Sequence, residues 1–221
     1  MTARVSRAIA ATATATVLVL VTAFVTASIV AGRDGAAAVP HRLRVAVVGD
    51  NYTAGVQNRA VWPTLMAQRT GWEVSNFALP GTGYVADGAG GQAFTYQVDR
   101  ARAAAPDVIL VFGGLEDTGL PETGSVSVGA TDAINKIVLG GERALIIGPP
   151  WYQAPAPAAV TGVSDAVGEV ARAAGAPYLD AAHPPLLTTD LMQADLSWPS
   201  DAGQAVLADR IADWIRSMVI R

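Results

Sequence analysis

The sequence predicts an α/β fold in which helices cover both faces of a parallel sheet. The first observation is a set of five short apolar runs, of the kind typical of strands buried on both faces. The runs are Leu43–Val48, Val74–Phe77, Val108–Phe112, Ala144–Ile147 and Pro177–Leu179. The second observation is that Ala-rich segments with helical spacing lie between them. Strands that alternate with helices favour a parallel sheet in a single domain.

Three segments carry the helical spacing most clearly. The first has an apolar face made by Trp62, Leu65 and Met66, with Arg69 at its end. A long helix is expected over 158–174, ending near Gly175, and a final amphipathic helix spans about 206–218. Loops are expected at Val85–Gly91 and Asp117–Gly129, which are rich in glycine or polar residues. Core-like positions are taken by Trp62, Trp72 and Trp214.

Composition excludes several classes of function. Of the 221 residues, 51% are hydrophobic and 15% are charged, and the formal net charge is −4. No Lys/Arg-rich run follows the N-terminal segment, so nucleic-acid binding is not expected. The chain contains no cysteine, which excludes disulfides, thiolate metal sites and a lipidated cysteine. We predict neither a cofactor nor a bound metal.

The N-terminal segment has the pattern of a membrane anchor. Arg4 and Arg7 precede an uncharged stretch that runs from Ala8 to Ala31. This stretch exceeds the ~7–15 apolar residues of a signal peptide and reaches the ~20 residues of a spanning helix. The sequence therefore predicts a transmembrane signal anchor at 1–32, a tether at 33–41 and the folded domain at 42–221. The upstream arginines place that domain outside the cytoplasm.

Cleavage of this segment is the alternative. Ala and Thr dilute its first half, and Ala36–Ala38 has the small side chains of a cleavage site. A cleaved leader would make the protein secreted, whereas an uncleaved one makes it a single-pass membrane protein. Both interpretations place the domain on the extracytoplasmic side.

The residues that follow each strand decide the function, because ligands of such sheets bind beyond the carboxyl ends of the strands. Gly49-Asp50-Asn51-Tyr52-Thr53 follows the first run, and Val61-Trp62-Pro63 opens the next helix. Asn76 and Gly81 are spaced as N-x-x-x-x-G after the second run. Gly114-Leu115-Glu116-Asp117 follows the third. Asp195-Leu196-Ser197-Trp198-Pro199 precedes the last helix, which opens with Ala202-Gly203-Gln204.

These four blocks, in this order, resemble those of the SGNH (GDSL-like) hydrolase family, and the resemblance covers nearly the whole domain. The family pattern is G-D-S-x-T, N-x-x-x-x-G, G-x-N-D and D-x-x-H-P. The resemblance implies a flavodoxin-like three-layer fold with a five-stranded parallel sheet. It also implies an ester hydrolase whose Ser attacks, whose His is the base and whose Asp orients that His. The oxyanion would be held by backbone N–H groups and the third-block Asn.

This chain departs from the family pattern at three of those positions. Asn51 stands at the nucleophile, and its carboxamide has no proton to lose. Trp198 stands at the base, and its indole N–H can only donate. Glu116 stands at the oxyanion donor, where an ionised carboxylate would repel the developing charge. Gly81 and Asp195 match. We therefore expect no ester chemistry at this site, because losing both nucleophile and base removes it.

Three further features leave alternatives open. Asp180-Ala181-Ala182-His183-Pro184 is a literal D-x-x-H-P, so His183 is either a relocated base or a loop histidine. Carboxylates expected at one rim could hold a cation or act as an acid/base pair, or could stabilise loops. Those carboxylates are Asp50, Glu116, Asp117 and Asp195. The aromatic residues Tyr84, Trp151 and Trp198 could face a ligand such as a sugar, or Trp198 could fill the vacated pocket.

Three hypotheses follow from these residues. The first is a non-catalytic, membrane-anchored domain that binds an envelope glycan, a lipid or a protein partner. The second is an active esterase or acyltransferase on envelope acyl groups, with a site rearranged around His183 and the carboxylates. The third is an anchored subunit of an envelope assembly without a small-molecule ligand.

Overall fold

The computed structural model describes residues 42–219, so the predicted anchor, the tether and His41 lie outside the described residues. Residues Arg42–Arg221 form one compact unit. Among residues 42–219, the two apolar cores of this unit are made by residues from Leu43 to Val219, and a fragment starting at residue 42 contains all of them.

Five parallel strands form a single sheet in the order β2-β1-β3-β4-β5. This is the flavodoxin-like order, and it confirms the predicted five-stranded parallel sheet. The strands are β1 (Arg44–Gly49), β2 (Glu73–Asn76), β3 (Val108–Phe112), β4 (Arg143–Ile147) and β5 (Tyr178–Leu179). β3 is buried at every position, as its continuous apolar run predicts. The strand order reverses at β1, because β2 is added on one side of β1 and β3, β4 and β5 are added on the other. Sheets of this kind bind ligands at the carboxyl ends of the strands at this point.

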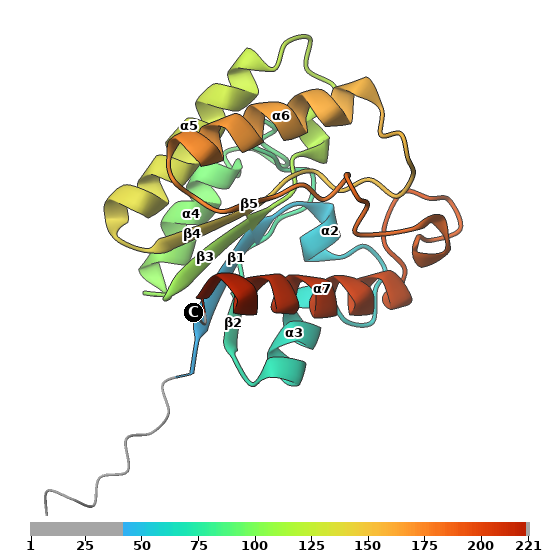
Figure 1. Cartoon of the computed structure of the whole chain (residues 1–221), viewed down its shortest axis with the longest axis horizontal. Coiled ribbons are helices and arrows are strands. Elements are labelled where there is room, and N and C mark those ends of the chain that lie inside the picture. Colours follow the sequence, from blue (N-terminus) through green and yellow to red (C-terminus); the bar gives the residue numbers. More distant parts are fainter. Residues whose placement is uncertain (1–41, 220–221) are drawn as a thin grey trace, which may run out of the picture. The chain divides into compact units, whose positions relative to one another are not determined.

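Helices cover both faces of the sheet (Figure 1). α3 (Trp62–Thr70) and α7 (Asp201–Val219) pack on one face, around a core that contains Trp62 and Met66. The other face is covered by α4 (Phe94–Ala103), α5 (Gly124–Gly140) and α6 (Ala158–Ala173). α2 (Asn51–Ala54) and two 3-10 turns, η1 (Leu115–Asp117) and η2 (Thr189–Leu191), complete the domain. Trp62 is fully buried, whereas Trp72 and Trp214 pack half-buried against the same core.

The expected loop at Asp117–Gly129 is wrong in its second half, because α5 begins at Gly124. Glycine, serine and valine give this stretch a low intrinsic preference for helix. Its buried side chains nevertheless recur at helical spacing, at Val126, Ala130 and Ile134, and they pack against the sheet. Tertiary burial therefore outweighs local propensity here.

No helix within residues 42–219 is both long enough and apolar enough to cross a bilayer. The predicted span at 1–32 falls outside that range.

Candidate functional site

Asp50 lies at the end of β1 and joins two of the functional loops. Its Oδ1 accepts the Tyr52 N–H at 3.0 Å, which caps α2, and its Oδ2 accepts the Gly114 N–H at 3.3 Å. A side chain at Gly113 would collide with this carboxylate, so only glycine lets the β3 loop approach. Asp50 is almost completely buried. Burial outweighs the two hydrogen bonds and raises the pKa of Asp50 from 3.8 to about 7.

Asn51 connects the second and third loops through its carboxamide. The Oδ1 atom accepts the Gly81 N–H at 3.2 Å, and Nδ2 donates to Glu116 Oε1 at 2.6 Å. A backbone N–H can only donate and a carboxylate can only accept, so both partners require the same orientation of the amide. The structure thus brings together three residues that the sequence placed in different blocks.

Asp117 holds the loop that carries Gly81. Its carboxylate accepts three backbone N–H groups, from Tyr84 at 2.7 Å, Val85 at 3.1 Å and Ala86 at 2.9 Å. Gly83 has no side chain that could block this approach, since a Cβ there would meet the carboxylate. Burial raises the pKa of Asp117 in spite of the hydrogen bonds. Asp117 is therefore a structural residue of the site.

Gln97 is a residue that the sequence interpretation missed. Its Oε1 accepts the Gly49 N–H at 3.0 Å, and its Nε2 donates to Thr82 Oγ1 at 2.8 Å. It therefore ties α4 to the end of β1 and to the loop after β2. The available clue was an amide among the apolar residues of one helical face, between Phe94 and Ala101, because a buried amide requires partners.

The last block is arranged differently from a catalytic Asp–His pair. Asp195 is exposed and its Oδ1 accepts the Ser197 N–H at 3.1 Å, which makes a local turn. Trp198 is half-buried against the apolar core. Its ring meets Tyr52 edge-on, with 6.0 Å between the centroids. Trp198 therefore acts as a packing residue beside α2.

The other two aromatic candidates, Tyr84 and Trp151, do not face a common ligand pocket. Tyr84 is in the core, 2% exposed, with its ring edge-on to Phe94 at 4.9 Å. Because it is buried, Tyr84 cannot present a face to a ligand. Trp151 is half-buried and stacks on Tyr152 at 4.9 Å.

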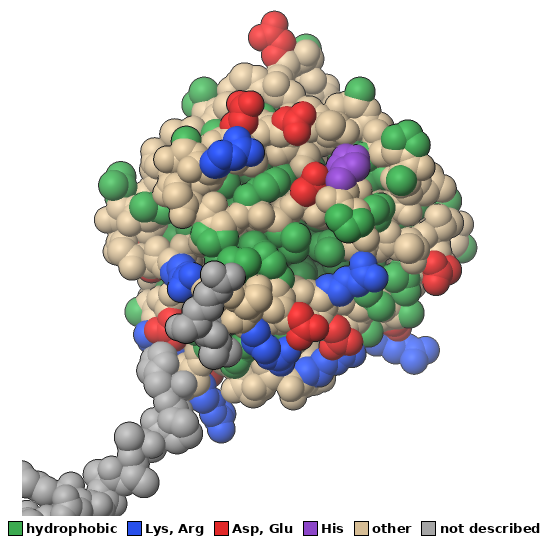
Figure 2. All heavy atoms as spheres, in the orientation of Figure 1, with side chains coloured by type: hydrophobic (Ala, Val, Ile, Leu, Met, Phe, Trp, Pro, Cys, Tyr) green, Lys and Arg blue, Asp and Glu red, His purple; other side chains and the backbone are tan. Residues whose placement is uncertain are grey.

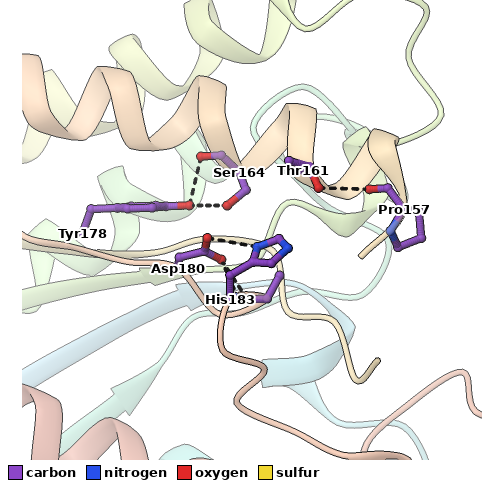
Figure 3. Close-up of polar contacts among 7 residues, drawn as sticks. Pro157, Thr161, Ser164, Tyr178, Asp180 and His183 are labelled. Atoms are coloured by element: carbon purple, nitrogen blue, oxygen red, sulfur yellow. Dashed lines mark hydrogen bonds and ion pairs between the residues drawn. The ribbon is translucent and has the colours of Figure 1, made fainter. Parts of the chain in front are cut away.

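His183 belongs to the loop after β5, an edge strand, whereas Asn51 follows β1, an inner strand of the sheet. Its Nδ1 is 3.2 Å from Asp180 Oδ2, and Asp180 Oδ1 accepts the His183 N–H at 3.1 Å (Figure 3). Figure 2 shows a histidine beside an acidic side chain on this face. Asp180 follows β5 directly, and β3 and β4 separate β5 from β1. At about 4.8 Å between neighbouring strands, β1 and β5 are roughly 14 Å apart in the sheet. His183 is thus oriented by Asp180, and its hydrogen bonds within residues 42–219 do not involve Asn51.

Three of the four predicted carboxylates lie close to one another: besides burial, the charges of Glu116 and Asp117 both act on Asp50 and raise its pKa. Their oxygens are largely engaged by backbone N–H groups and by Asn51. These hydrogen bonds favour a structural role for the three carboxylates.

The Asn51 carboxamide is hydrogen-bonded on both sides. The Gly81 N–H, which would hold an oxyanion, is occupied by the Asn51 carbonyl oxygen. Glu116 occupies the position of a donor but accepts instead.

Comparisons with known proteins agree with this fold. Residues 47–206 match the GDSL-like Lipase/Acylhydrolase family. The GDSL lipase Rv0518 of Mycobacterium tuberculosis is 34% identical over 189 residues, which cover 77% of this chain and 80% of that protein. Esterase EstA from a Pseudoalteromonas species superposes with a TM-score of 0.64 at 17% identity, covering 80% of this chain and 98% of that one.

A family two carbohydrate esterase from Cellvibrio japonicus has the same fold, with a TM-score of 0.64 at 13% identity. It covers 80% of this chain and 62% of that chain. At these identities the structural likeness shows the fold alone, whereas the sequence match over residues 47–206 shows the family. The chain belongs to the GDSL-like (SGNH) hydrolase family.

Proposed function

We propose that this protein is a non-hydrolytic member of its family, anchored in the membrane by residues 1–32. It would act outside the cytoplasm by binding an envelope glycan, a lipid or a protein partner. One observation carries the loss of ester chemistry: the Asn51 carboxamide accepts the Gly81 N–H and donates to Glu116. The side chain at the nucleophile position therefore fills the place where an oxyanion would lie.

The identity of Trp198 supports the same proposal. Its indole cannot accept a proton near neutral pH, and the ring packs against Tyr52. Loss of both the nucleophile and the base costs several orders of magnitude in rate. The uncharged stretch from Ala8 to Ala31 supports the anchor.

The test is ester hydrolysis by fragment 42–221 on p-nitrophenyl acetate, p-nitrophenyl butyrate and acetylated xylo-oligosaccharides. We expect the wild-type rate to equal that of the Asn51→Ala variant. The triple variant Asn51→Ser/Glu116→Asn/Trp198→His should hydrolyse at least about 100-fold faster than the wild type, because it supplies a nucleophile, an oxyanion donor and a base.

A second candidate function is supported by the Asp180–His183 contact, which orients an exposed imidazole as a base. Wild-type turnover that disappears in a His183→Ala variant would establish this esterase function and reject our proposal. Wild-type turnover that disappears in the Asn51→Ala variant instead would also reject our proposal, because it would show catalysis at Asn51.

The anchor and the binding role have separate tests. The full chain should remain with the membrane pellet after alkaline carbonate extraction, whereas fragment 42–221 should be released. A full chain found in the medium, shortened near Ala38, would support the cleaved alternative. Co-sedimentation of the fragment with purified peptidoglycan, and separately with lipid vesicles, would distinguish the classes of ligand.

A further inference from the structure

A pocket of about 470 Å³ lies outside the Asn51 site, between the loop after β2 and α4. It is lined by Leu79, Pro80, Ala89, Gln92 and Arg100. Its volume is within the ~300–1,000 Å³ that small-molecule pockets occupy. The pocket borders the site described above through Pro80, the neighbour of Gly81, and through the hydrogen bond of Gln92 with Gln97, but Asn51 and Glu116 do not line it.

Hydrogen bonds fix the walls of this pocket in advance. One wall is the loop that Asp117 holds through three backbone N–H groups, and it is closed by a bridge between Thr82 and Asp87. The Gln92 carbonyl accepts from the buried Gln97 at 3.2 Å. A pocket with fixed walls does not have to be ordered when a ligand binds, so less affinity is lost.

The lining combines an apolar surface with unused polar groups. Leu79, Pro80 and Ala89 supply the apolar part. Arg100 is exposed, and the hydrogen bonds and ion pairs found within residues 42–219 leave its guanidinium unpaired. The neighbouring Arg102 differs, because its Nε lies 3.0 and 3.1 Å from the two oxygens of Glu142. A free guanidinium beside an apolar wall suits a planar carboxylate attached to an apolar chain.

We propose that this pocket binds an amphiphilic monocarboxylate. The carboxylate pairs with Arg100, aided by the Gln92 amide, and the apolar chain lies over Leu79 and Pro80. This site is independent of the loss of ester chemistry at Asn51, so it stands whether or not the protein hydrolyses esters.

The experiment is isothermal titration of fragment 42–221 with octanoate, octanol and octylammonium, with octanol below its solubility limit and the two ions below their micellar concentrations. Octanoate should bind at one site and more tightly than the other two. Arg100→Gln should weaken octanoate at least about tenfold and leave octanol unchanged, because only the charged contact is lost. Arg172→Gln is the matched control, since Arg172 is also an exposed arginine near the end of a helix.

A second variant tests the position without touching the core. Ala89→Asp adds a negative charge to the lining and should also weaken octanoate. In amide NMR spectra, octanoate should shift the signals of Ala89 and Gln92 in the wild type. The proposal is rejected if Arg100→Gln binds octanoate as tightly as Arg172→Gln does. It is equally rejected if octylammonium binds as well as octanoate, or if saturating octanoate shifts signals elsewhere only.

Discussion

Asp117→Ala is expected to lower the free energy of unfolding of fragment 42–221 by about 3 to 5 kcal/mol. Three backbone N–H groups, those of Tyr84, Val85 and Ala86, would lose their acceptor. Leaving a buried donor unsatisfied costs about 1–3 kcal/mol, and the two partly buried donors cost less because water can reach them. A domain of this size has a stability of only about 5–15 kcal/mol, so this loss is a large fraction of it.

Urea unfolding at pH 7.5, followed by circular dichroism, measures this effect. Asp117→Asn retains one acceptor oxygen and should lose about half as much. Glu122→Ala is the control, because Glu122 is an exposed acid near the start of α5, and its loss should stay within about 0.5 kcal/mol. If Asp117→Ala unfolds within 1 kcal/mol of the wild type, the carboxylate does not hold the loop.

The second large effect is a pH dependence that originates at Asp50. Its pKa is raised from 3.8 to about 7 by burial. Between these two values the native state holds a proton that the unfolded state has released. The contribution of Asp50 to stability is therefore full below about pH 4, falls as pH rises, and is lost above about pH 7. At 1.36 kcal/mol per pH unit, we expect a fall of about 2–3 kcal/mol between pH 5 and pH 8.

The Asp50→Asn variant isolates this contribution, because its amide stays neutral and its carbonyl oxygen can still accept the Tyr52 N–H. Its stability should fall less than that of the wild type between pH 5 and pH 8. Urea unfolding of both proteins at several pH values gives the two slopes. Equal slopes would mean that Asp50 does not titrate in this range.

Much of the sheet could be predicted from the sequence, because strands buried on both faces leave continuous apolar runs. The predicted run 108–112 coincides with β3, and the other strands differ from their runs by one residue at one or both ends. α4 and α5 were not predicted. The start of α5 is determined by packing of Val126 and Ala130 on the sheet, which local propensity does not show.

The site was predictable as a set of blocks, but its contacts were not. Block order placed Asn51, Gly81 and Glu116 together, and the structure joins them through one carboxamide. The separate position of His183 depends on β5 lying at the opposite side of the sheet, and strand order is a long-range property. The burial of Tyr84 likewise depends on Phe94, which belongs to a helix that was not predicted.

The Asn51 bridge covers the Gly81 N–H, so a ligand of that group would have to displace the Asn51 side chain. A ligand that needs the Gly81 N–H can bind only those molecules in which the Asn51 side chain has rotated away. If breaking its two hydrogen bonds costs about 2–3 kcal/mol, roughly one molecule in 30 to one in 150 is open at any moment. The apparent affinity of such a ligand is lowered by the same factor. The affinity of such a ligand would therefore depend on how often the Asn51 side chain leaves this rotamer.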